Sequence, residues 1–332
     1  MSSTGTRYRQ QQSTKMIQTN NSKILVAVAA FDEKYVKTTI ESGLDNAHDK
    51  SNIVFGINYQ SSDGCFDDLS EYSNNVKVVY SVSEFPRGLG ADRMVASSFW
   101  NGEKYFFQID GHMLFEPNWD ICLIDALESI KKSGFEKPII STFVPWWSVS
   151  EDGDILHYAP GTVNCCSVCS YEAGDINSLW LEPKRVFNET VCGKEIKEHH
   201  TISAHYMFTH ANWLEEVGHD ARIIWIGDEH MIAMRSWTRG YRIFSIGQPY
   251  AWHLNKGAGK QAKDWRHSIR NNHHNRDSFR FKLDFERTRK FLTGQEFGHG
   301  GAPNETLLKM YEKASGLNFV EMYDMFDRCD AV

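Results

Sequence analysis

Residues 105–115 have the sequence YFFQIDGHMLF, an apolar and aromatic run that ends in an acid, a glycine and a histidine. Such a run is typical of a buried central strand, and open α/β sheets bind their ligands at the carboxyl ends of strands. Asp110 and His112 are two residues apart, so in extended geometry their side chains leave the same face. A carboxylate and an imidazole presented together can hold a divalent cation such as Mn²⁺. The simpler alternative is that Asp110 caps the next turn beside an ordinary polar histidine, because D-x-H alone is a weak pattern.

The stretch lies within an alternation of expected strands and helices. We expect strands at residues 23–31, 52–59, 76–82, 105–109 and 138–146, and helices at residues 35–47, 93–100 and 120–132. This order predicts an α/β fold with a mostly parallel central sheet and helices packed against it. A nucleotide-binding domain is the natural interpretation.

Two common nucleotide-binding motifs are missing. A dinucleotide-binding enzyme would carry its glycine fingerprint directly after the first strand, but Ala29-Ala30-Phe31-Asp32 stands there. Gly88 and Gly90 form a G-x-G, with Arg93 in the place of the third glycine. The sequence also lacks the G-x-x-x-x-G-K-[ST] phosphate loop. These observations argue against a Rossmann oxidoreductase and against a P-loop phosphotransferase.

The composition indicates a globular protein. The chain has 332 residues, of which 41% are hydrophobic and 13% aromatic, and its net charge is −7. No apolar run approaches the roughly 20 residues that cross a bilayer, and residues 1–22 lack the apolar core of a signal peptide and suit a flexible tail. The seven cysteines are scattered, and a chain of this length does not need disulfides. The single C-x-x-C at residues 166–169 could begin a zinc site, but no second C-x-x-C follows, so buried or incidental thiols are expected there. We therefore expect a soluble, cytoplasmic protein in a reducing compartment.

The second half of the sequence is less regular. Residues 148–197 are expected to form loops, which could serve as a lid or an acceptor-binding insertion. Asp228 and Glu229 open an expected helix, where acids are often only complements of the helix dipole. His253 is expected between the end of a strand and a Gly/Lys-rich loop that contains Lys256. Residues 256–290 hold eleven Lys and Arg against four acids, which indicates either an anion-facing surface or a solvated helical face.

Several of these signals, taken together and in order, resemble one enzyme family. The chain is similar to the α-N-acetylglucosaminyltransferases that modify hydroxyproline on Skp1-type proteins, and more distantly to the polypeptide N-acetylgalactosaminyltransferases. The matching pieces are residues 24–31, 88–93, 102–115, 227–229 and 237–241, His253, and residues 298–301. The chain departs from the family at Gly111, where a serine is usual, at Leu114, where an arginine is usual, and at Asp228, where a glutamate is usual.

The resemblance implies a fold and a set of site residues. It implies a GT-A nucleotide-sugar fold over residues 23–320, with a nucleotide-binding part at 23–147, an acceptor and metal-completing part at 148–260, and a basic helical part at 261–320. It implies a retaining transfer of a sugar from UDP-GlcNAc or a similar donor to a hydroxyl group. The implied metal ligands for Mn²⁺ or Mg²⁺ are Asp110, His112 and His253; Asp228 or Glu229 would act at the sugar, and Phe31, Asp32, Arg87, Arg93 and Lys256 would contact the nucleotide.

The acceptor and the chemical route stay open at this point. Retention could arise by front-face attack or through a covalent carboxylate intermediate. The acceptor could be a protein, or hydroxymethylated bases in phage-type DNA, which the basic tract would suit. A non-catalytic nucleotide-sugar or carbohydrate-binding module is a third interpretation.

Overall fold

A computed structural model describes residues 22–84, 86–150, 152–158, 165–177, 182–224, 227–255 and 279–329. For residues 165–177 and 182–189 it describes the backbone alone. Nearly all of the expected N-terminal tail, the loop with Lys256 and most of the basic tract therefore lie outside the described residues.

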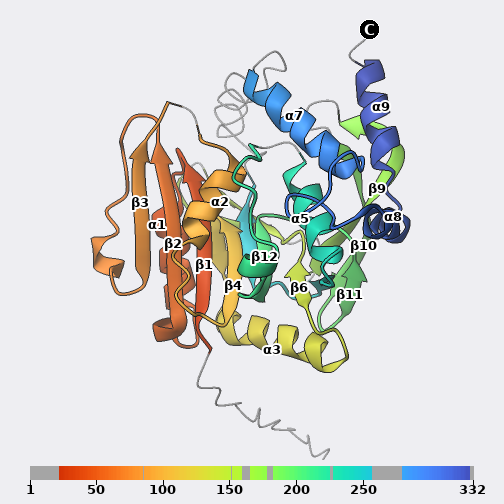
Figure 1. Cartoon of the computed structure of the whole chain (residues 1–332). Helices are drawn as coiled ribbons and strands as arrows, with labels where there is room; N and C mark the ends of the chain where they lie inside the picture. Colours follow the sequence, from red (N-terminus) through yellow and green to blue (C-terminus); the bar gives the residue numbers. More distant parts are fainter. Residues whose placement is uncertain are drawn as a thin grey trace, which may run out of the picture.

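One eight-stranded sheet forms the centre of the fold, in the order β11-β13-β6-β12-β4-β1-β2-β3 (Figure 1). Its strands are β1 (Ile24–Phe31), β2 (Ile53–Ser61), β3 (Val76–Val82), β4 (Tyr105–Asp110), β6 (Pro138–Ser141), β11 (Ile196–His199), β12 (Tyr206–His210) and β13 (Arg242–Ile246). Strands β1 to β4 are parallel, and β13 is parallel to β6. Strand β12 runs antiparallel between β4 and β6, and β11 is antiparallel to β13. The prediction of a mostly parallel sheet is confirmed.

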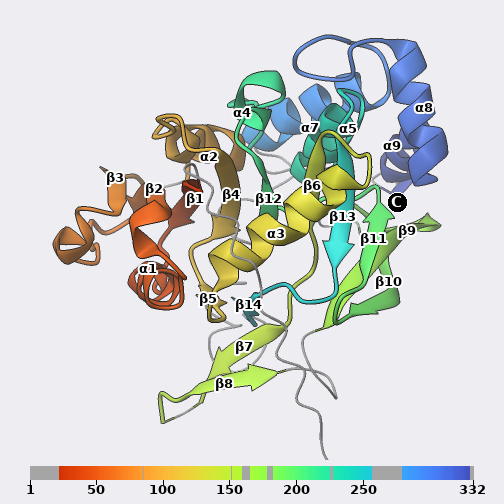
Figure 2. The same cartoon turned by 90° about the horizontal axis from the view of Figure 1, so that it is seen from below.

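Helices cover both faces of this sheet (Figure 2). One face packs against α1 (Val36–Asp45) and α3 (Trp119–Lys132). The other packs against α2 (Leu89–Ser97), α4 (Trp213–Glu216), α5 (Asp228–Trp237), α7 (Phe279–Leu292), α8 (Glu305–Ser315) and α9 (Phe319–Cys329). No helix in the described part of the chain is long and apolar enough to span a membrane.

Strand β1 shows why its sequence is continuously apolar. Ile24, Val26 and Val28 face the core under α1 and α3, whereas Leu25 and Ala27 face the core on the other side. All five are at most 1% exposed. Since successive side chains of a strand alternate between its faces, a strand covered on both sides must be apolar at every position. Burial of each large aliphatic side chain stabilises the fold by about 1.5–3 kcal/mol.

A second, smaller sheet has the order β5-β14-β7-β8 and consists of β5 (Met113–Phe115), β7 (Trp146–Val149), β8 (Ile155–Tyr158) and β14 (Ala251–Leu254). The β7–β8 hairpin projects from the body of the molecule beside β14 (Figure 2). The strand expected at residues 138–146 therefore divides into β6 and β7, which belong to different sheets. His253 follows the end of β13 as expected, but it lies inside a further strand, β14, which the sequence did not predict.

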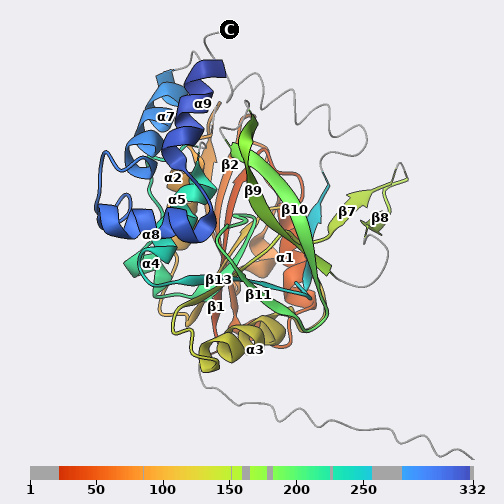
Figure 3. The same cartoon turned by 90° about the vertical axis from the view of Figure 1, so that its right-hand side faces the viewer.

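The expectation of loops at residues 148–197 is also wrong. This region contains β8 and β11, together with the long antiparallel pair β9 (Cys165–Asn177) and β10 (Glu182–Cys192), drawn in green in Figure 3. Cys192 is disulfide-bonded, which contradicts the expectation that a chain of this length does without disulfides. Cys65 and Cys122 are free thiols.

Helix α2 begins at Leu89, four residues before the expected start. The glycines on either side of Leu89 serve the packing of the backbone. Gly88 has a φ of +129°. A Cβ at Gly90 would lie 1.9 Å from the carbonyl oxygen of Asp220. The amides of Leu89 and Gly90 donate to the carbonyls of Ile224 and Ile223. The G-x-G therefore serves the close approach of two backbone segments.

Candidate metal centre

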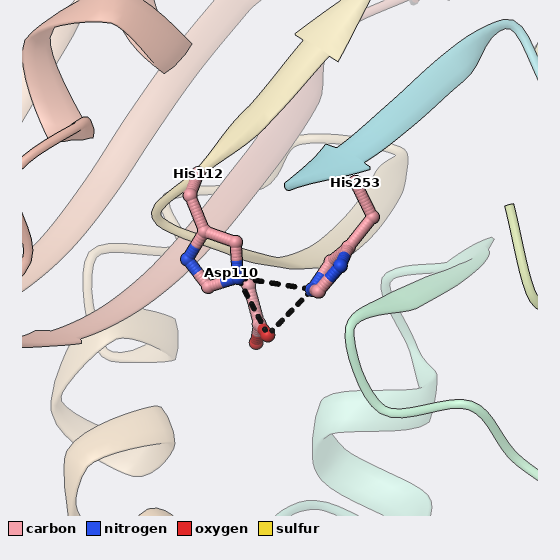
Figure 4. Close-up of side chains that lie close together, drawn as sticks. All are labelled: Asp110, His112 and His253. Carbon is pink, nitrogen blue, oxygen red and sulfur yellow. Dashed lines mark hydrogen bonds and ion pairs between the residues drawn. The ribbon is translucent and has the colours of Figure 1, made fainter. Parts of the chain in front are cut away.

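Asp110, His112 and His253 converge at the carboxyl end of β4 (Figure 4). Asp110 is the last residue of β4, and His112 lies in the turn that leads into β5. Strand β14 pairs with β5 so that His253 is opposite Met113, which brings the second histidine back from about 140 residues away. One ligand atom from each of the three side chains lies within 4.8 Å of the others.

The distances within the triad are short. His112 Nε2 and His253 Nε2 are 2.9 Å apart, and Asp110 Oδ2 lies 3.3 Å from His253 Nε2 and 3.5 Å from His112 Nε2. Burial opposes ionisation of Asp110, but the hydrogen bond from His253 and the charges of the neighbouring imidazoles hold its pKa well below the usual value. The carboxylate is therefore ready to bind a cation at neutral pH.

Glu33 orients His112. Its Oε2 lies 2.7 Å from His112 Nδ1, and the two side chains are only 10% and 5% exposed. Because a carboxylate accepts but does not donate, Nδ1 carries the proton and Nε2 presents its lone pair to the triad. Gly111 permits this contact, since a Cβ there would lie 2.9 Å from Glu33 Cγ. The glycine at position 111 thus has a structural reason.

The donor set fits a divalent transition metal. Two imidazole nitrogens and one carboxylate oxygen face a common point, and the Nε2 atoms of His112 and His253 confront each other at hydrogen-bond distance. With Nδ1 of His112 donating to Glu33, a cation between these atoms would receive a lone pair from each ring. Mixed nitrogen and oxygen ligands suit Mn²⁺ better than Ca²⁺ or Mg²⁺, which prefer oxygen alone.

A short turn beside the triad carries another histidine. The ring of His205 lies 4.5 Å from that of His253, centroid to centroid. Ala204, the preceding residue, is held on both sides: Gln108 Nε2 donates to its carbonyl at 2.7 Å, and its amide donates to Glu229 Oε1 at 2.7 Å. Glu229 therefore fixes the turn that places His205 next to the metal ligands.

Asp228 forms a buried ion pair with Arg93. Arg93 lies in α2 and Asp228 is the first residue of α5, and each side chain is 7% exposed. The structure thus brings a residue expected at the phosphates together with one expected at the sugar. Asp228 is more than a complement of the helix dipole, because it neutralises a buried guanidinium.

Among the remaining expected nucleotide contacts, Phe31 and Asp32 lie at the end of β1 and Arg87 lies in the loop between β3 and α2. Asp32 has a φ of +46° and accepts hydrogen bonds from the amide and hydroxyl of Ser62, at 2.7 and 2.8 Å. Phe31, the last residue of β1, is partly buried. Arg87 donates to Asn58 Oδ1 at 2.8 Å and lies 3.4 Å from Asp92. Lys256 is outside the described residues.

Sequence reasoning missed Glu33 and His205. Glu33 directly follows Asp32 in the sequence, and the ring of His205 lies beside that of His253 in space. No sequence spacing relates Glu33 or His205 to the triad. The contact of Glu33 depends on how the β1–α1 loop crosses the Gly111 turn. The position of His205 depends on the antiparallel insertion of β12. Both contacts arise from tertiary packing, which a local sequence pattern does not predict.

Comparison with known proteins agrees with this architecture. A family model described as Glycosyltransferase (GlcNAc) matches residues 67–306. No curated protein matches the sequence. The crystal structure of GalNAc-T7 with UDP, GalNAc and Mn²⁺ is similar at a TM-score of 0.51 and 12% identity, over 91% of this chain and 56% of that one. The chain thus spans little more than half of the GalNAc-T7 chain.

Two structures of residues 1–349 of S. aureus TarS are similar at lower scores. TarS alone gives a TM-score of 0.41 and 15% identity, over 82% of this chain and 75% of that one. Its complex with UDP gives 0.42 and 13%, over 81% and 72%. The likeness to GalNAc-T7 supports the GT-A fold. Because the matched family model covers well over half of the sequence, the chain belongs to the Glycosyltransferase (GlcNAc) family.

Proposed function

We propose that the protein is a metal-dependent, retaining glycosyltransferase that moves a sugar from UDP-GlcNAc, or a similar nucleotide sugar, to a hydroxyl group of an acceptor. The convergence of Asp110, His112 and His253 at the carboxyl end of β4 carries this proposal. Family membership supports the reaction class. The likeness to the hydroxyproline-modifying enzymes supports an N-acetylglucosamine donor and retention of configuration.

The nucleotide and the metal would be bound by separate groups of residues. Phe31 and Asp32 would meet the base and ribose, and Arg87 would approach the phosphates, with Lys256 as a further contact. Asp110, His112 and His253 would hold Mn²⁺, which supplies positive charge to the departing diphosphate.

The ion pair of Arg93 and Asp228 would lie at the transferred sugar. The Asp228 side chain is buried and already paired with the Arg93 guanidinium, so its carboxyl oxygens can accept hydrogen bonds from sugar hydroxyls without a large further cost of desolvation. Glu229, which accepts from the Ala204 amide, would act by holding the turn rather than by touching the sugar.

A thermal-shift panel tests the proposal. UDP-GlcNAc, UDP-GalNAc, UDP-glucose and UDP are each added with Mn²⁺ or with EDTA. We expect a UDP-linked sugar to raise Tm only with Mn²⁺, because a ligand at 100 times its Kd stabilises the folded state by about 2.7 kcal/mol. Asp110→Ala should remove the shift. An equal shift with EDTA, or no shift by any nucleotide sugar, would contradict the proposal, and salt-sensitive binding of duplex DNA would support the nucleic-acid alternative.

A further inference from the structure

Trp146 is an exposed aromatic residue beside a metal ligand. It lies in β7 directly opposite His253 of β14 in a parallel pair. Paired residues of neighbouring strands project from the same face of a sheet, so the indole stands next to the imidazole of His253. Trp146 is 52% exposed, whereas Trp147, the next residue, is 1% exposed.

The two faces of the small sheet differ accordingly. Leu114, Trp147, Trp252 and Leu254 form a closed apolar cluster on one face. The opposite face carries His253 and Trp146, and β8 adds Leu156, which pairs with Ser148 and is 41% exposed. We name these three residues the Trp146 face. An indole left open to water contributes little to folding, and exposed apolar surface of this kind marks binding sites.

The Trp146 face is opposite the face that contacts the loop after β1. The expected nucleotide contacts Phe31 and Asp32 lead into this loop, where the ring of Tyr35 packs on Trp147 on the closed face, 5.3 Å away between centroids. A molecule lying on Trp146 would therefore reach the triad from the direction opposite to the nucleotide.

The charge of the hairpin restricts what can bind there. Residues 146–158 contain Glu151, Asp152 and Asp154 and no lysine or arginine. Such a segment repels a polyanion, which argues against DNA on this face. An open indole in a hairpin without basic residues suits a neutral ligand that donates hydroxyl hydrogen bonds and has an apolar C–H surface.

We propose that the Trp146 face is an acceptor subsite for a sugar ring, which stacks its C–H surface on the indole while one hydroxyl points toward the triad. The proposal rests on the proposed function, because the sugar transferred comes from the nucleotide donor. The acceptor oxygen forms the new bond to the anomeric carbon as the bond from that carbon to the diphosphate oxygen breaks. The hydroxyl proton leaves with the released diphosphate.

Saturation-transfer difference NMR tests the subsite without turnover. The probes are the methyl glycosides of glucose, galactose and N-acetylglucosamine, added to the full chain with UDP and Mn²⁺. We expect the ring C–H protons of at least one glycoside to be saturated by the wild type. Trp146→Ala should weaken binding about tenfold, as loss of an aromatic stacking contact does, and Trp146→Phe should weaken it less.

Ile155→Ala is the matched control. Ile155 lies in the same hairpin and is 46% exposed, but it pairs with Val149 and so faces away from the Trp146 face. This variant should bind the glycosides as the wild type does. The Mn²⁺-dependent shift with nucleotide sugars, measured on the wild type and on Ile155→Ala, reads the proposed function separately and should be the same in both proteins.

Three results would overturn the subsite. They are the absence of saturation of every glycoside by the wild type, equal saturation by the wild type and Trp146→Ala, and equal losses in Trp146→Ala and Ile155→Ala. If the nucleotide-sugar shift is present while the glycosides fail, the subsite is wrong and the proposed function stands. If that shift is missing, the proposed function itself fails.

Discussion

Glu33 and His112 are 79 positions apart in the sequence, and their side chains meet at 2.7 Å behind the metal triad. The carboxylate fixes the imidazole in the tautomer that binds a metal through Nε2. Glu33→Ala should therefore weaken Mn²⁺ binding about 10- to 100-fold, as is usual for a residue that orients a metal-binding histidine. Glu33→Gln should lose less, because its amide oxygen still accepts from Nδ1. Electron paramagnetic resonance titration of free Mn²⁺ measures both, and equal affinity in all three proteins would contradict this role.

Asp110→Ala should abolish sugar transfer and leave the fold intact. The side chain is one third exposed and lies at the end of a strand, so its removal creates no large cavity. Initial rates with a UDP-sugar measure transfer, and far-ultraviolet circular dichroism checks the fold. In the wild type, excess EDTA should stop the reaction and Mn²⁺ should restore it. Full activity of Asp110→Ala, or turnover that is unaffected by EDTA, would contradict a role of the metal in the reaction.

Asp228→Asn should cost about 3–5 kcal/mol of stability, because it leaves Arg93 buried without its counter-charge. Glu229→Gln should cost no more than about 1 kcal/mol, since the amide oxygen can still accept from Ala204. Urea unfolding measures both. The double variant Arg93→Met with Asp228→Leu should recover part of the loss. Equally small losses of stability in Asp228→Asn and Glu229→Gln would indicate that Asp228 only complements the helix dipole.

His199 should make stability depend on pH. Burial lowers the pKa of this imidazole to about 4, and its Nε2–H donates to the Ser141 carbonyl at 2.9 Å. The folded state therefore resists protonation while the unfolded state protonates near pH 6.5. Stability is complete above pH 6.5, falls as the pH drops toward 4, and is then lower by about 3 kcal/mol. Urea unfolding from pH 4 to 7 should show this slope in the wild type. A slope of the same size in His199→Gln would rule this histidine out as its source.

The first half of the fold could be predicted from sequence because β1 and β4 are buried on both faces and are therefore apolar runs with clear ends. β3 is a more exposed edge strand whose valines and tyrosine favour a strand, and α1 and α3 follow the helical period. The strands between residues 148 and 197 could not be predicted in the same way. Within the described residues β9 and β10 form a separate two-stranded sheet, and their sequences lack a strong apolar alternation. β6 and β7 could not be separated, since Pro138 to Trp146 is apolar throughout although its two halves join different sheets.

The metal ligands could be predicted only in part from local pattern. D-x-H suggested Asp110 and His112, whereas His253 entered through the family resemblance, because the β5–β14 pairing that completes the triad leaves no mark in either segment. The ion pair of Arg93 and Asp228 could not be predicted, because the family resemblance implies that each side chain contacts a bound ligand. In the structure the two buried side chains pair with each other.

The pairing of β5 with β14 also has a consequence for biosynthesis. A ribosome completes Asp110 and His112 long before it adds His253, and β1 to β4 can pair with one another before His253 is made because all four precede it in the sequence. The nascent chain therefore holds two metal-binding side chains without the third until the strand at Ala251 is made. The three proposed ligands of the cation come together only after that strand has docked. Binding of the metal by all three would therefore indicate that the second half of the chain has folded onto the first.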